Sequence, residues 1–295
     1  MSWIQNRKKP IQVETVQTLT KTQGTILGRS FGYAALGFVI MAALIAGLTC
    51  AWQFGVFNDG NWYWNNPAYQ GLNIGLTIGS FVLTITSAIL SMFWQGKMMT
   101  NQKATGMTFL VWGFFIVGQA MAFSWLMFML NNSIYRNPQG NVISLWWVCP
   151  AAFGLAVVLF GLMSIIGYSL SNKGQLTVKK MMLAVGLAFG IMMLPMFILM
   201  LMSIWMPWGA GTMFWLCFVM MILFLFLLLL SILSIIGDIK RCDQFAQLNI
   251  PSEQQGTIVK NLSLMFGFSL LVEFVCLVWL LIWLILSIMG LSRRF

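Results

Sequence analysis

One carboxylate stands in a run of residues that is otherwise almost wholly apolar. Glu273 lies in "SLLVEFVCLVWLLIWLI", residues 269–285, a stretch that is apolar enough to be buried in lipid. A charge at the centre of a membrane helix costs about 2.5–3.5 kcal/mol on insertion scales. Ionisable side chains at such positions bind ions, relay protons or pair with another polar group, so Glu273 is a candidate functional residue.

A second carboxylate, Asp238, ends the preceding apolar run. Ser231, Ser234 and Asp238 are spaced by three and four residues, which places them on one face of a helix. Because Asp238 lies at a helix boundary, Lys240 or Arg241 can neutralise its charge.

A stripe of small polar side chains marks a third apolar run, between residues 71 and 95. Its members recur every three or four residues and therefore share one helix face. They are Asn73, Thr77, Ser80, Thr84, Ser87, Ser91 and Gln95. Gly71, Gly75 and Gly79 lie among them at the spacing that lets two membrane helices approach closely. The stripe is consistent with a tightly packed helix interface or with the wall of a hydrated path.

The composition defines the class of protein that must position these groups. The chain is 60% hydrophobic and 7% charged, whereas soluble domains carry about 25% charged residues. We therefore expect an all-α, polytopic membrane protein. It has no histidine, and its five cysteines are scattered, so we expect neither a zinc site nor a disulfide framework. We expect no enzymatic activity and no cofactor.

The long apolar runs predict seven transmembrane helices, each able to cross a hydrocarbon core of ~30 Å. They lie near residues 31–53, 71–95, 107–130, 145–169, 181–206, 213–237 and 263–289. On this division, residues 1–30 form a polar, basic N-terminal segment and residues 31–292 form the transmembrane domain.

The basic residues predict the orientation of these helices. Of the 16 Lys and Arg residues, 13 fall on the side that includes the N-terminal segment and 3 on the other. The basic side should be cytoplasmic, which places the N-terminus in the cytoplasm and the C-terminus outside. The net charge of +10 then indicates contact with anionic membrane lipid rather than with nucleic acid.

Three polar groups on different predicted helices should lie at similar depth. At a rise of about 1.5 Å per residue, Glu273 lies about 15 Å from the cytoplasmic end of its span. Gln119 and Thr84 lie about twelve and about eleven residues from that side in their own spans. We therefore expect the three side chains near the midplane of the membrane.

The order of these features resembles the Bax-inhibitor-type family, also called the transmembrane Bax inhibitor motif family. "GRSFGYAALGFVIMAALIAGLTCAW" resembles its first span, and "SMFWQGKMMTNQKATGMTFLVWGFFIVG" its second span, basic turn and third span. "FGLMSIIGYSLSNKGQL" is similar to its fourth span. "LSILSIIGDIKRCDQF" and "LLVEFVCLVWLLIWLI" resemble its sixth and seventh spans.

The resemblance implies roles for particular residues. In bacterial calcium-leak members of the family, a carboxylate that ends the sixth span pairs with one inside the seventh, senses pH and gates a pore. Asp238 and Glu273 match these positions, with Glu in place of Asp at the second, which would make both transient ligands of Ca²⁺. Lys97 matches a basic residue that latches the pair, and Ile85 lies near the place of an absent glutamate.

The leading functional hypothesis is a pH-sensitive cation leak, with Ca²⁺ as the expected ion, in a bacterial plasma membrane. Hard divalent cations prefer carboxylate, carbonyl and water oxygens. Glu273 and Asp238 would supply the charge, while Gln119, Thr84 and Ser87 would line the path. Two close carboxylates share one proton, and its loss would open the path. The alternatives are a proton-coupled secondary transporter and a non-transport membrane scaffold or regulator.

Overall fold

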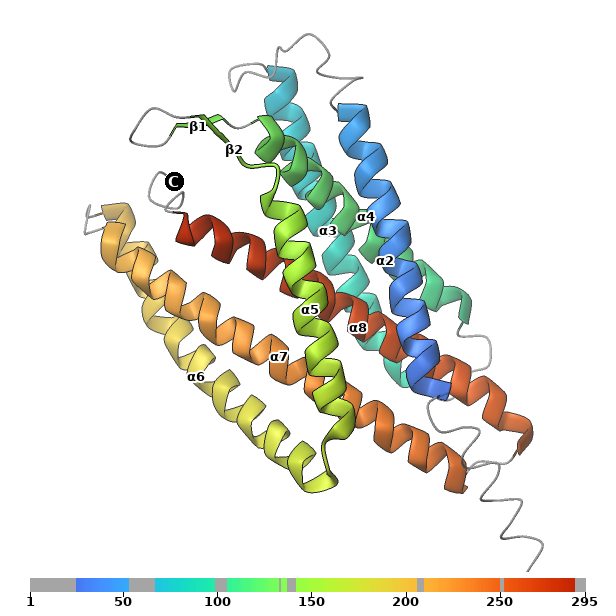
Figure 1. The fold of residues 1–295 in the computed structure, drawn as a ribbon. Coiled ribbons are helices and arrows are strands. Elements are labelled where there is room, and N and C mark those ends of the chain that lie inside the picture. Colours follow the sequence, from blue (N-terminus) through green and yellow to red (C-terminus); the bar gives the residue numbers. More distant parts are fainter. Residues whose placement is uncertain are drawn as a thin grey trace, which may run out of the picture.

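The computed structural model describes residues 25–52, 67–98, 105–132, 134–136, 142–205, 210–249 and 252–289. These residues form a bundle of seven helices (Figure 1). The helices are α2 (Thr25–Ala51), α3 (Pro67–Met98), α4 (Thr105–Asn132), α5 (Val148–Ser169), α6 (Asn172–Trp205), α7 (Ala210–Asn249) and α8 (Ser252–Ile288). Two short strands, β1 (Ile134–Arg136) and β2 (Val142–Ser144), pair antiparallel between α4 and α5.

All seven helices are long and apolar enough to cross a membrane. The prediction of an all-α, seven-span architecture is therefore confirmed, and the chain is an integral multi-pass membrane protein. Several helices are longer than the predicted spans: α6 begins at Asn172, where the span was expected from residue 181, and α7 continues to Asn249. An apolar run marks only the part of a helix inside lipid, and backbone hydrogen bonding carries the helix on into water.

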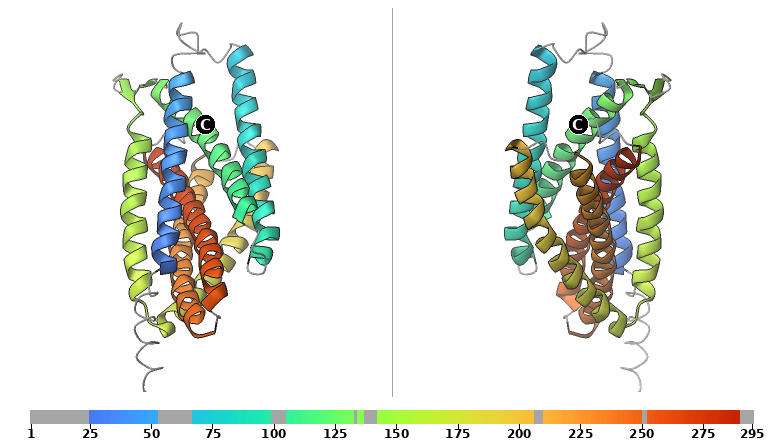
Figure 2. Two further views of the ribbon diagram at one scale, coloured as in Figure 1. Left: turned by 90° about the vertical axis from the view of Figure 1, so that its right-hand side faces the viewer. Right: turned by 90° about the vertical axis from the view of Figure 1, so that its left-hand side faces the viewer.

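Helix α8 lies at the centre of the bundle and, among the described residues, supplies more buried apolar side chains than any other helix. It packs against α2, α5 and α7 along much of its length, and it also touches α3 and α4. Figure 1 shows it crossing between the other helices, and Figure 2 shows α3 and α5 on opposite sides of the bundle. Its fully buried side chains include Leu264, Leu270, Leu277 and Ile282. A carboxyl group on this helix is therefore held inside protein rather than in open lipid.

Close contact between α2 and α8 depends on a glycine. A Cβ atom on Gly267 would lie 2.9 Å from Cβ of Tyr33 and 3.0 Å from the backbone oxygen of Ser30. The ring of Trp112 from α4 packs edge-on against Tyr33, with ring centroids 6.4 Å apart. Three helices thus meet where the smallest residue lets two backbones approach.

The glycines of α3 do not play the part that their spacing predicts. Among the described residues, Cβ atoms on Gly71 and Gly75 would meet nothing within 4 Å, and one on Gly79 would meet only the end of Met121. The close approach of α3 and α4 instead occurs at Gly118, where a Cβ would lie 3.1 Å from the backbone oxygen of Ser80. Spacing alone cannot identify which glycines meet a neighbour, because that depends on helix rotation.

We predict that Gly267→Ala lowers the stability of the protein. The added methyl group would press on backbone and Cβ atoms that cannot rotate away, and overpacking of this kind costs about 1–3 kcal/mol. Gly154→Ala is the matched control, because a Cβ at this α5 position meets nothing within 4 Å. Thermal unfolding of the detergent-solubilised protein should show a lower Tm for Gly267→Ala alone. Equal Tm values for the two variants would contradict the close contact.

Candidate functional site

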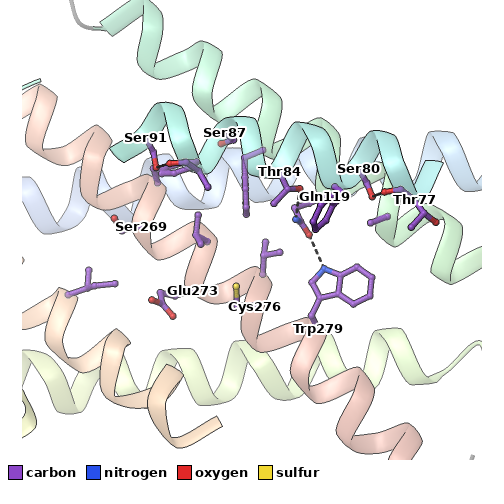
Figure 3. Close-up of a pocket in the computed structure, with 18 residues that line it drawn as sticks. Thr77, Ser80, Thr84, Ser87, Ser91, Gln119, Ser269, Glu273, Cys276 and Trp279 are labelled. Atoms are coloured by element: carbon purple, nitrogen blue, oxygen red, sulfur yellow. Dashed lines mark hydrogen bonds between the residues drawn. The ribbon is translucent and has the colours of Figure 1, made fainter. Parts of the chain in front are cut away.

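A cavity of about 570 Å³ lies between the α3–α4 pair and the α7–α8 pair. Eight polar side chains line it (Figure 3): Thr77, Ser80, Thr84, Ser87, Ser91, Gln119, Ser269 and Glu273. Thr77, Ser80, Thr84, Ser87 and Ser91 of the α3 stripe form one wall, and Glu273, Cys276 and Trp279 project from α8 on the other side. Asn73 and Gln95, the two ends of the predicted stripe, lie outside the residues whose side chains are described. Thr84, Gln119 and Glu273, which were expected at similar depth, all line this cavity.

Among the described residues, only one of the two carboxyl oxygens of Glu273 has a hydrogen-bond partner. Its Oε1 atom accepts a hydrogen bond from the hydroxyl of Ser231 on α7, with 2.6 Å between the oxygens. Its Oε2 atom is buried and has no hydrogen-bond partner among the described residues. A buried carboxyl with one unpartnered oxygen costs free energy, so the site favours an occupant that supplies a proton or a positive charge.

Gln119 joins the two sides of the cavity. Its amide nitrogen donates to the hydroxyl of Thr84 on α3 at 3.0 Å, and its amide oxygen accepts from the indole N–H of Trp279 on α8 at 2.9 Å (Figure 3). The Trp279 ring also stacks on Phe123 of α4, with centroids 4.3 Å apart. The chain Thr84–Gln119–Trp279 therefore ties α3, α4 and α8 together across the cavity.

The serines of the cavity wall are satisfied by backbone oxygens. Ser80, Ser91 and Ser269 donate to carbonyl groups of their own helices, three or four residues earlier. Ser87 is fully buried and donates to the backbone oxygen of Val111 on α4 at 2.9 Å. Because each hydroxyl proton is already engaged, its oxygen is left to act as an acceptor. Such a surface suits a cation better than an anion.

Asp238 does not belong to this cavity. Its carboxylate binds the ammonium group of Lys179 on α6, at 2.7 and 3.1 Å. Asp238 lies seven residues beyond Ser231 on α7, or about 10 Å farther along the helix axis. The expected pairing of Asp238 with Glu273, and with it a shared Ca²⁺ site, is therefore not formed in this structure.

The basic residues near these carboxylates also differ from expectation. Lys240 donates to the backbone oxygens of Tyr168 and Leu170 and so caps the C-terminal end of α5, instead of neutralising Asp238. Lys179, which takes that role, lies near the start of α6 and is 59 residues distant in sequence. Lys97 lies in α3, beyond the residues whose side chains are described, so its expected role as a latch stays a prediction.

The described residues contain no group of three or more acidic or cysteine side chains that could hold a metal ion tightly. Within the cavity, Glu273 is the single acidic side chain among the lining residues, and the other oxygen ligands are hydroxyls and the Gln119 amide. A cation in this cavity would therefore meet a weak set of oxygen ligands.

Two residues of the site were not identified as partners from sequence. Ser231 was placed on one helix face with Ser234 and Asp238, yet its contact with Glu273 depends on how α7 and α8 rotate. Trp279 gave a weaker signal: an indole N–H in an apolar span needs an acceptor. The sequence does not show that Gln119 is this acceptor, because the contact depends on how α4 and α8 pack.

No protein-family model, no curated protein and no solved structure matches the chain. The resemblance to Bax-inhibitor-type proteins therefore stays a prediction.

We predict that Gln119 and Trp279 stabilise the bundle as a pair. Gln119→Leu and Trp279→Phe should each lower the unfolding free energy, because hydrogen bonds in membrane proteins average about 0.6 kcal/mol and reach about 1.7. The double variant should lose less than the two single variants together, since both remove the same bond. Reversible unfolding in SDS measures all four free energies. Additive losses would show that the bond contributes nothing.

Proposed function

We propose that the protein conducts cations, with Ca²⁺ as the leading candidate, along a path through the cavity beside Glu273. The observation that carries this proposal is the geometry of that residue: among the described residues it is the sole acidic side chain that lines the cavity, and one of its oxygens has no hydrogen-bond partner. A cation would supply the missing charge, and the serine and threonine oxygens opposite would replace part of its water shell.

The order of the polar residues suggests a route. In the proposed orientation, with the N-terminus cytoplasmic, Ser91 and Ser269 lie on the cytoplasmic side of Glu273, and Thr77 and Ser80 on the outer side. Between Glu273 and the outer residues lies the chain Thr84–Gln119–Trp279. Trp279 is about 9 Å from Glu273 along α8, so this chain would form the constriction.

Protonation of Glu273 would set the conductance. In its protonated state the carboxyl is neutral, and it offers a cation little attraction in a medium of low dielectric constant. In its ionised state it attracts the cation and compensates for part of the lost hydration. Flux should therefore rise with pH. A single carboxyl suffices for this response, and a pair with Asp238 is not needed.

The family assignment and cellular location belong to the same proposal. The resemblance to calcium-leak members of the Bax-inhibitor-type family supports a cation path, and the compact seven-span form supports a bacterial plasma membrane. Glu273, which the resemblance marks in the seventh span, lines the cavity.

We predict that Ca²⁺ flux into proteoliposomes rises several-fold between pH 5 and pH 8, and that Glu273→Gln removes this dependence. Glutamine keeps the size of the side chain and its ability to accept from Ser231, but it cannot ionise. Flux is measured with a Ca²⁺ indicator inside the vesicles, for protein whose folding is verified by gel filtration and Tm.

Asp238→Asn is the matched control, because it removes a carboxylate that lies outside the cavity. Both side chains of its ion pair are about 40% exposed (41% and 39%), so losing the pair should cost at most about 1 kcal/mol. We expect the wild-type pH profile. A flattened profile in Asp238→Asn would show that the two carboxylates pair in the conducting state. An unaltered profile in Glu273→Gln would overturn the proposal.

A second candidate function is proton-coupled transport of an organic solute. The observation that favours it is the size of the cavity, which exceeds what a bare ion needs. Pockets of about 300–1,000 Å³ commonly hold small organic molecules. Saturable uptake driven by a pH gradient would favour this function. Absence of any flux, together with a stable co-purifying protein, would favour a scaffold.

A further inference from the structure

The lining of the cavity is more apolar than a path for inorganic ions requires. Ten of the side chains that form it are apolar, and four of these are aromatic: Phe81, Phe115, Phe268 and Trp279. At about 570 Å³, the cavity is in the range of sites that enclose a small organic molecule. Its size and lining together indicate an occupant with a large apolar surface.

The charge within the cavity restricts that occupant further. Glu273 is the sole ionisable carboxyl among the described lining residues, and none of those residues is a lysine or arginine. Its Oε2 atom is buried without a partner. A neutral apolar occupant would leave this oxygen unpartnered, and an anion would be repelled by it, whereas a cation would satisfy it.

The aromatic rings suit the same charge. The face of an aromatic ring attracts a cation, and rings placed around a cavity are a common means of binding quaternary ammonium groups. Phe115 of α4 and Phe268 of α8 meet edge to face with ring centroids 5.5 Å apart, and both line the cavity. Rings and carboxyl together can bind a delocalised positive charge that carries little water.

The α3 wall gives such a molecule a way in from the membrane. Phe81 lines the cavity and is 64% exposed, and Ala88, two turns farther along the helix, is also exposed. Helix α3 packs chiefly on α4. Part of this wall therefore lies at the lipid-facing surface, where lipophilic molecules concentrate.

We propose that the cavity binds a lipophilic organic cation, with its charged centre at Glu273, in exchange for the proton of that carboxyl. This inference rests on the proposed role of Glu273 as the cation site. When the cation binds, the Glu273 carboxyl loses its proton to water and the carboxylate pairs with the cation. One proton is released for each cation bound, and acid should weaken binding. Among the residues that line the cavity, the other titratable group is the thiol of Cys276.

The test compares two probes of the same shape. Methyltriphenylphosphonium carries a positive charge, and triphenylethane is its uncharged carbon analogue. Equilibrium binding to the full-length protein in nanodiscs is measured at pH 5.5 and pH 8. We expect the phosphonium to bind more tightly at pH 8 than at pH 5.5. In weakly buffered solution at pH 5.5, where the carboxyl is protonated, its binding should release close to one proton. Triphenylethane should bind weakly at both pH values.

Three variants assign the binding to the carboxyl. Glu273→Gln should weaken phosphonium binding at pH 8 by about tenfold or more, which corresponds to at least about 1.4 kcal/mol. Glu273→Asp keeps the charge and should retain most of the affinity. Asp238→Asn removes a carboxylate outside the cavity and should bind as the wild type does. If Glu273→Gln does not fold, the pH dependence and proton release of the wild type still decide the question.

Several outcomes would overturn this inference. Equal binding of the two probes would show that the cavity takes any apolar molecule, as a lipid chain would. Phosphonium binding that is unchanged in Glu273→Gln would place the probe elsewhere. Ca²⁺ flux that depends on Glu273, without phosphonium binding, would refute this inference and leave the proposed function standing. Phosphonium binding that depends on Glu273, with no Ca²⁺ flux at any pH, would support this inference and refute the proposed Ca²⁺ conduction.

Discussion

The position of α8 inside the bundle is the constraint on which the rest of the structure depends. A helix surrounded by others can bury its side chains in protein, and α8 does so through close packing with α2 at Gly267 and with α5 and α7 elsewhere. Since most of the described side chains of α8 are buried or partly buried against other helices, the carboxyl of Glu273 meets Ser231 and a cavity instead of lipid tails. The cost of burying this group is therefore reduced by the helices around it.

The remaining polar groups of the site follow a common rule in apolar surroundings. Ser80, Ser87 and Ser91 each give their proton to a backbone oxygen, and Gln119 uses both ends of its amide. Glu273 departs from the rule, because one of its oxygens is buried without a partner. An unsatisfied group among satisfied neighbours is a position where a proton or ligand would contribute most free energy.

Part of this site could be predicted from sequence because it depends on local geometry. Helical spacing placed the polar residues of α3 on one face, and rise per residue placed Thr84, Gln119 and Glu273 at one depth. Both rules hold whatever the neighbouring helices do. The seven spans were predictable for a similar reason, since each needs only enough apolar residues to cross lipid.

The contacts between helices could not be predicted in the same way. Asp238 was expected to pair with Glu273, but it lies about 10 Å farther along α7 than Ser231, the partner of Glu273, and binds Lys179 of α6 instead. Gly118 rather than Gly75 allows α3 and α4 to approach, although both satisfy the composition rule for close packing. Rotation depends on the fit of many side chains at once. No short motif records it.

A lone carboxyl and a paired one would make different demands on the surrounding helices. A pair senses pH through the repulsion of two charges, which requires two helices to hold both groups within a few ångströms. A lone carboxyl responds to pH through the fraction of molecules in which it carries a proton, since a proton and a cation compete for the same oxygen. Whether the result is a leak or an exchange then depends on the far side of the cavity. On the proposed function, a bond from Trp279 to Gln119 that persists while Glu273 is ionised would let the cation leave only by the way it entered, and a bond that opens would let the same site conduct.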